Sequence, residues 1–189
     1  LNDAQCQYLT DAYDASIRHV DQQIGRLFDA INPEETTTIV SSDHGEELWE
    51  HGHFGHGQGS SASSRSMTLY EEVLQVPLVV ADGASDCVVD EPVSLLDLVP
   101  TVLDIADVEL EPDLLGSSLR DGREPYDTPV IAQATIPPDP VVFAKEADST
   151  VLSSIKTDGG KYIHCEGRFE EFYDLNDDPG EQNDVLDDH

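Results

Sequence analysis

The stretch Thr36-Thr37-Thr38-Ile39-Val40-Ser41-Ser42-Asp43-His44-Gly45 decides the fold class and locates the candidate site. Residues 36–42 are short and rich in β-branched side chains, which predicts a strand. In open α/β sheets, ligands bind beyond the carboxyl ends of the strands, where Asp43 and His44 lie. Gly45 permits a turn there at no steric cost, so the adjacent carboxylate and imidazole can both reach one divalent cation.

The segment that follows, residues 45–65, is rich in Gly, His and Ser and lacks apolar periodicity, which predicts a long loop. Long loops inside compact domains are usually functional or disordered. Three more histidines, His51, His53 and His56, lie within 12 residues of His44. Histidines at this density favour a metal site or a site for a phosphate-like anion. The alternative is a solvated, histidine-rich loop.

Helical and strand patterns surround this loop on both sides. Apolar side chains recur in steps of three and four from Leu9 to Ile31, which predicts an amphipathic helix that Asn32-Pro33 ends. Further along, the patterns predict a short helix, a strand, a second helix and another strand at residues 67–72, 76–80, 94–107 and 130–134. This mixture of elements indicates an α/β fold.

The C-terminal part of the chain has the pattern of antiparallel strands. Two β-rich runs, 151–157 and 161–165, flank Asp158-Gly159-Gly160, which is a strong hairpin signal. A second reversal at Glu166-Gly167 leads into a further run at 169–175. We therefore expect a partial α/β domain over residues 1–135 and a small antiparallel subdomain over residues 136–189.

The charge balance is extreme, with 40 Asp and Glu against nine Lys and Arg and a net charge of −31. Self-repulsion of this size destabilises a compact state in dilute buffer. At molar salt the Debye length falls to about 3 Å, so the repulsion is screened. We interpret the excess as adaptation to a salt-rich cytoplasm, because a disordered acidic chain would lack the apolar periodicity. The same charge argues against nucleic acid and anionic membranes as partners.

The sequence has few features that indicate where in the cell, or outside it, the protein is located. No run of 18 apolar residues is present, so no membrane span is expected. The start of the chain is not a signal peptide, although this says nothing about export if the chain is a fragment. Three widely spaced cysteines without a C-x-x-C motif favour buried free thiols in a reducing interior. A cytoplasmic location is therefore expected.

Four motifs occur in one order along the chain: D-H-G-x4-E-H-G at 43–52, L-Y-E-E-V-L-Q-V-P-L-V-V at 69–80, S-L-L-D-L-V-P-T-V-L-D at 94–104 and E-F-Y-D-L-N-D-D-P-G-E-Q-N at 171–183. In this order they resemble the C-terminal half of sulfatases of the alkaline-phosphatase superfamily. The resemblance covers nearly the whole chain and is weakest between residues 109 and 151. It implies part of an alkaline-phosphatase-like sandwich, a mixed sheet with helices, followed by a small C-terminal antiparallel sheet.

The resemblance also implies roles for individual residues. Asp43 and His44 match the pair that binds a divalent metal in the family, commonly calcium, with magnesium or manganese as alternatives. His56 stands where many members have a lysine that contacts the sulfate or the leaving oxygen, and an imidazolium can do similar work. His51 matches the family's E-H-G motif and is expected to support the site.

The motif that carries the family's nucleophile is missing from this chain. Sulfatases convert Cys or Ser in C/S-x-P/A-x-R to formylglycine, and no cysteine here has Arg four residues later. The run from Ser61 to Arg65 has the spacing, but Ser63 replaces the Pro or Ala and the run follows D-H-G instead of preceding it. The family's N-terminal pair of metal-binding aspartates is also missing. The resemblance thus implies a piece of a longer protein, inactive alone, with formylglycine in the other half.

Three functional hypotheses remain open. The first is the metal and leaving-group side of a sulfuric ester hydrolase, acting on a small-molecule sulfate ester. The second is a phosphodiesterase or phosphonate monoester hydrolase of the same superfamily, which shares the D-H-G pattern. The third is a non-catalytic binding or assembly module. If half of the sheet is missing from this chain, the exposed sheet edge and apolar face would favour association into a homo-oligomer.

Overall fold

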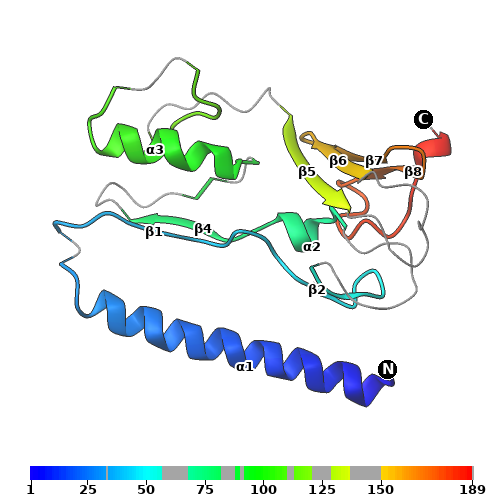
Figure 1. Cartoon of the computed structure of the whole chain (residues 1–189), viewed down its shortest axis with the longest axis horizontal. Coiled ribbons are helices and arrows are strands. Elements are labelled where there is room, and N and C mark those ends of the chain that lie inside the picture. The colour runs from blue at the N-terminus through cyan, green and yellow to red at the C-terminus, as the bar shows by residue number, and fades with distance from the viewer. Residues whose placement is uncertain are drawn as a thin grey trace.

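The first helix is long and stands apart from the rest of the chain. The computed structural model describes residues 1–32, 34–56, 68–81, 88–89, 92–109, 113–120, 129–136 and 150–188. Helix α1 (Asp3–Phe28) confirms the amphipathic prediction and begins at a capping box between Asn2 and Gln5. It contains no buried residue, and apolar side chains such as Ile17, Val20 and Leu27 are more than half exposed. Its apolar stripe is therefore largely uncovered, and Figure 1 shows α1 along one side of the molecule.

Strand β1 (Thr38–Ser41) confirms the predicted strand before Asp43, and it pairs antiparallel with β4 (Leu78–Ala81). Ile39 faces Val80 in this register. Helix α2 (Glu71–Leu74) lies between them in sequence and starts later than the predicted helix, because Tyr70 is still extended. In Figure 1, this pair of strands is drawn between α1 and the helix α3 (Leu98–Ile105).

The predicted helix at 94–107 is present in two parts, the 3-10 turn η1 (Leu95–Asp97) and α3 (Leu98–Ile105). Ser94 and Asp97 form a capping box at its start. The Asp97 carboxylate is fully buried and also accepts a hydrogen bond of 2.8 Å from the backbone N–H of Ser117. Asp97 thus holds the later segment 113–120 against the helix start, in addition to the favourable position of its charge.

The C-terminal sheet has four antiparallel strands in the order β5-β6-β7-β8. They are β5 (Val130–Ile136), β6 (Thr150–Lys156), β7 (Gly160–Cys165) and β8 (Phe169–Asp174), followed by the 3-10 turn η2 (Leu186–Asp188). The hairpin around Asp158-Gly159-Gly160 is confirmed, with Lys156 opposite Lys161. The expected boundary at 135/136 falls inside β5, which pairs with β6 along its whole length. The division into two domains stays a prediction.

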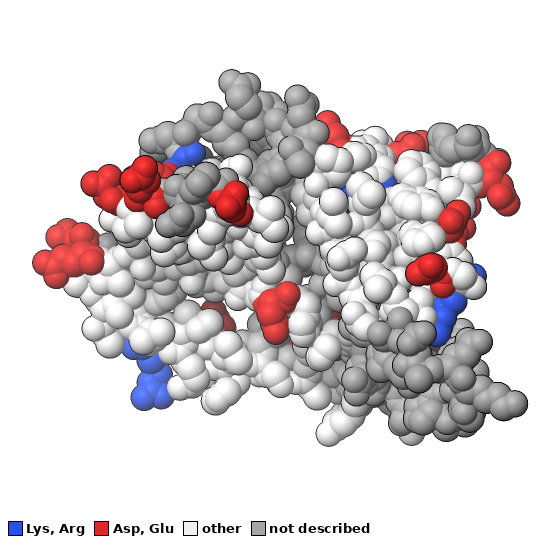
Figure 2. Space-filling model, turned by 45° about the horizontal axis from the view of Figure 1, so that its top comes forward, with Lys and Arg blue, Asp and Glu red and all other residues white. Residues whose placement is uncertain are grey.

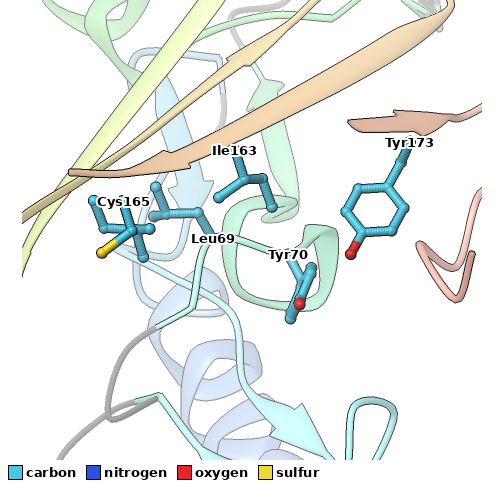
Figure 3. Packing of buried hydrophobic residues seen from close by; sticks show 6 residues of the cluster. Leu69, Tyr70, Ile163, Cys165 and Tyr173 are labelled. Carbon is cyan, nitrogen blue, oxygen red and sulfur yellow. The ribbon is translucent and has the colours of Figure 1, made fainter. Parts of the chain in front are cut away.

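The buried apolar cluster lies where this sheet meets the segment before α2. Its members are Leu69, Tyr70, Leu152, Ile163, Cys165 and Tyr173, and Figure 3 shows most of them. Cys165 is buried, as expected, whereas Cys6 is only partly buried and Cys87 lies outside the described residues. This core therefore joins α2 to the C-terminal sheet.

The excess of acidic over basic side chains is visible on the surface of the protein. Figure 2 shows Asp and Glu side chains spread around one face of the molecule and few Lys or Arg. Within the described part of the chain, no helix combines the length and the apolar character that crossing a membrane requires.

Candidate functional site

The predicted metal pair lies directly after β1. Ser42 holds the chain there, because its hydroxyl donates a hydrogen bond of 2.6 Å to the carbonyl of His44. The backbone N–H of His44 donates to Asp43 Oδ1 at 3.1 Å. The Asp43 side chain is 86% exposed and that of His44 is 39% exposed. Both groups are thus accessible at the end of the strand.

Gly45 is needed for close packing and not for the turn that the sequence suggested. Its N–H donates to the carbonyl of Val73 at 2.7 Å, and the N–H of Glu46 donates to the carbonyl of Glu72 at 2.9 Å. A Cβ atom on Gly45 would lie 2.0 Å from the Glu72 carbonyl oxygen. Only glycine allows the backbone after the metal pair to lie directly on α2.

The donor atoms of Asp43 and His44 suit a shared cation. His44 Nδ1 lies 2.8 Å from the Gly45 carbonyl, which can only accept, so Nδ1 carries the proton and Nε2 presents its lone pair. Metal-binding histidines are commonly oriented by such a backbone contact. Nε2 lies 3.7 Å from Asp43 Oδ2, a spacing that two ligands at about 2.0–2.6 Å from one ion can have. In the absence of a cation, a positive charge on the protonated His44 ring, then nearby backbone N–H groups, lower the pKa of the Asp43 carboxyl.

The pair supplies only part of a metal site. Among the residues described, no group of three or more His, Cys, Asp or Glu side chains is arranged to hold an ion. Calcium takes about 6–8 oxygen ligands and magnesium about six ligands. The donor set therefore fits one side of a divalent-metal site, and other groups would have to complete it.

The loop expected at 45–65 contains a small hairpin in its described part. Strands β2 (Glu47–Leu48) and β3 (Phe54–Gly55) pair antiparallel, which corrects the prediction of an unstructured loop. At the tip, the N–H of Gly52 donates to the carbonyl of Trp49 at 2.9 Å. Gly52 has a φ of +79°, so the glycine of E-H-G occupies a conformation that other residues rarely adopt. The run from Ser61 to Arg65 lies outside the described residues.

This hairpin returns His56 to the metal pair. The His56 and His44 rings lie 4.1 Å apart between centroids, at an interplanar angle of 38°. His56 Nδ1 contacts the Glu46 carboxylate at 3.0 and 3.2 Å. The structure therefore gathers Asp43, His44 and His56 in one cluster.

His51 belongs to a different set of contacts. Its Nδ1 lies 2.5 Å from Glu72 Oε1 on α2, and its Nε2 lies 2.8 Å from the carbonyl of Glu181 in the C-terminal turn. The ring also stacks on Tyr70 with centroids 3.7 Å apart. Burial alone would lower the pKa of His51, but the acceptors at Glu181 and Glu72 outweigh it, so the pKa is raised. Since both ring nitrogens of His51 face acceptors, the protonated ring connects the loop to α2 and to the C-terminal turn.

The sequence analysis did not predict one buried ionic network, which joins Glu71, Lys161 and Glu181. The fully buried Lys161 on β7 places Nζ 2.9 Å from Glu71 Oε1 and 2.8 Å from Glu181 Oε1. The contact with Glu181 is an ion pair outside hydrogen-bond geometry. Glu181 Oε2 accepts from the backbone N–H of Glu71 at 2.6 Å, and Lys156 also contacts Glu71. The signal available was Lys161 itself, one of only three lysines in a chain of 40 carboxylates.

The mixed α/β arrangement of helices and antiparallel sheets is that of the alkaline-phosphatase-like fold. A family model described as Sulfatase matches residues 2–108, more than half of the chain. The chain belongs to the sulfatase family.

Individual relatives and solved structures agree with this assignment. The uncharacterised sulfatase YidJ of Escherichia coli K12 is 29% identical over 177 residues, covering 89% of this chain and 32% of YidJ. A crystal structure described as that of a sulfatase from Bacteroides thetaiotaomicron VPI-5482 superposes with a TM-score of 0.74 at 22% identity, covering 97% of this chain and 39% of the other. The phosphonate monoester hydrolase of Agrobacterium radiobacter gives 0.71 at 24% identity, covering 91% and 36%. The chain spans about a third of the length of the relatives it matches.

Proposed function

We propose that this chain supplies the metal-binding and leaving-group side of a sulfuric ester hydrolase. The observation that carries the proposal is the cluster of Asp43, His44 and His56 beyond β1, in a chain of the sulfatase family. A small-molecule sulfate ester is the proposed substrate class.

Each residue has a distinct task in this proposal. Asp43 Oδ2 and His44 Nε2 would hold a divalent cation, with calcium the first candidate and magnesium or manganese the alternatives. When bound, such a cation stabilises negative charge on the ester oxygens. His56 is half exposed beside the pair, where its protonated ring can donate to the leaving oxygen.

The nucleophile is proposed to lie outside this chain. No C/S-x-P/A-x-R motif is present in the 189 residues, so a formylglycine would come from a preceding part of the protein. The uncovered apolar stripe of α1 is consistent with further polypeptide packing there. The chain alone is therefore expected to be inactive, and in isolation its edge strands favour a homo-oligomer. A cytoplasmic location remains part of the proposal.

The test is hydrolysis of an aryl sulfate in molar salt, by this chain alone and by a protein in which it follows a formylglycine-bearing N-terminal part. We expect turnover only from the longer protein. Removal of divalent ions, Asp43→Asn or His44→Ala should each lower kcat/KM by at least about a hundredfold. The matched control is His164→Ala, which removes an exposed histidine that pairs with Glu170 on the C-terminal sheet. Turnover by the chain alone, or equal loss in the control, would refute the proposal.

A second candidate is phosphonate monoester or phosphodiester hydrolysis, favoured by the superposition on the Agrobacterium radiobacter enzyme. Assay of a phosphonate monoester beside the aryl sulfate decides between them, because the better substrate has the larger kcat/KM. If neither is hydrolysed by the longer protein, the binding-module hypothesis gains support.

A further inference from the structure

Glu46 has an environment unlike that of a solvated surface carboxylate. Its side chain is only 17% exposed, in a chain whose many carboxylates are expected to face water. Its backbone N–H is fixed by the carbonyl of Glu72 on α2, one residue after Gly45 is fixed by Val73. The carboxylate therefore projects from a part of the backbone that cannot shift freely.

The β2–β3 hairpin brings this carboxylate to His56. Glu47 lies opposite Gly55 in the register, so Glu46 and His56 are the next facing positions at the open end of the hairpin. Both Glu46 oxygens are within reach of His56 Nδ1, at 3.0 and 3.2 Å. A carboxylate can only accept, so Nδ1 carries a proton and Nε2 is the ring atom left for other partners.

The ring of His44, which lies beside that of His56, is also held at its Nδ1 atom. Its Nδ1 is occupied by the Gly45 carbonyl, as His56 Nδ1 is occupied by Glu46. The two rings lie against each other at 4.1 Å, and each has its Nδ1 tied to the protein. The Glu46 carboxylate is shielded while the His56 ring is 51% exposed, so the open part of this pair is the imidazole.

We propose that Glu46 is the positioning residue of His56, holding its ring so that Nδ1 is protonated and Nε2 faces the leaving group. This rests on the proposed function of His56. An exposed ion pair that does not orient the ring would contribute less than about 1 kcal/mol to stability, and its loss would change neither the tautomer of His56 nor kcat. The two interpretations therefore differ in the tautomer that His56 adopts without Glu46 and in the effect of that loss on kcat.

The first test uses this chain in molar salt, labelled with ¹⁵N-histidine, at a pH where the His56 ring is neutral. Long-range ¹H–¹⁵N spectra report which ring nitrogen carries the proton, and His56→Asn assigns the signals. We expect the proton on Nδ1, and a shift toward the Nε2-protonated form in Glu46→Ala, which removes the acceptor outright. Glu46→Gln should give a smaller shift, because its amide oxygen can still accept a hydrogen bond. Glu170→Gln is the matched control, because it should change only the signals of His164.

The second test uses the longer, active protein. Glu46→Ala should lower kcat by about tenfold to a hundredfold, the usual effect of losing a group that orients a site histidine, and change KM by less than about twofold. A His56 proton on Nε2 in the unsubstituted chain, or a tautomer that Glu46→Ala leaves unchanged, overturns the proposal. If the tautomer shifts as expected but His56→Ala retains full activity, the proposed function of His56 fails while the Glu46 contact stands.

Discussion

Replacement of Lys161 by Met should lower the free energy of unfolding far more than replacement of Lys156 by Met, although both lysines contact Glu71. Lys161 Nζ is completely buried between Glu71 and Glu181, whereas the Lys156 side chain is 26% exposed. Methionine has similar length and apolar character, so the substitution removes the charge while leaving little cavity. The perturbation is therefore mainly electrostatic.

The size of the effect follows from what remains buried. Without Lys161, Glu71 still has Lys156, and Glu181 Oε2 still accepts from the Glu71 N–H. Glu181 Oε1 loses the cation 2.8 Å away and its side chain is 0% exposed. Removing one partner of a buried ion pair costs about 3–5 kcal/mol. Lys156→Met should cost less than about 1 kcal/mol, because Glu71 keeps Lys161 and water reaches the site.

The assay is urea unfolding in molar salt, followed by the fluorescence of Trp49, the single tryptophan, and by circular dichroism. With a slope near 2 kcal/mol per molar, Lys161→Met should lower the midpoint by about 1.5–2.5 M urea. Adding Glu181→Gln should recover at least about 1 kcal/mol, since a neutral amide oxygen can still accept from the Glu71 N–H. Equal losses for the two lysine variants, or no recovery in the double variant, would show that Lys161 does not neutralise buried carboxylates.

Two further substitutions test the contacts that hold the site loop. The folded-state pKa of His51 is raised above its ordinary value of 6.5, so its stabilisation is fully present below about pH 6.5 and is lost as the pH rises through the folded-state pKa. The difference in free energy of unfolding between the wild type and His51→Gln, measured in urea across pH 6–9, should therefore decrease as the pH rises. A difference that does not change with pH contradicts the raised pKa of His51. Gly45→Ala should cost at least about 2 kcal/mol, because its Cβ would lie 2.0 Å from the Glu72 carbonyl oxygen. Gly25→Ala on α1, where a Cβ meets nothing within 4 Å, should instead stabilise by about 0.5–1 kcal/mol; similar losses in both would disprove the packing argument.

Features encoded by neighbouring residues could be predicted from the sequence. The turn Asp158-Gly159-Gly160 carries its own conformational preference, and the hairpin formed as expected. The apolar spacing before Asn32 likewise produced α1, although the helix ends at Phe28. Asp43 and His44 are adjacent in sequence, so a strand that ends before them presents both together.

Features that depend on distant contacts were not predicted. In a chain with 40 carboxylates, nothing local distinguishes Glu46, Glu71 or Glu181 from residues that face water. Their burial depends on partners that the fold supplies, such as Lys161, which is 90 residues from Glu71. The need for Gly45 has the same origin, since the obstructing carbonyl belongs to Glu72 on α2. Sequence patterns describe periodicity and turns, but ion pairs and close backbone contacts require the tertiary structure.

The C-terminal motif and the Asp43-His44 pair are connected through tertiary contacts although they are far apart in sequence. Glu181 binds the N-terminal end of α2 through the Glu71 N–H and receives the His51 ring at its carbonyl. Helix α2 in turn fixes Gly45 and the following residue through its carbonyls. The segment beyond β1 is therefore held by α2 and, through Glu181, by the turn that follows β8, whereas β1 itself is held by β4. A loss of that turn should loosen the D-H-G segment before it disrupts β1.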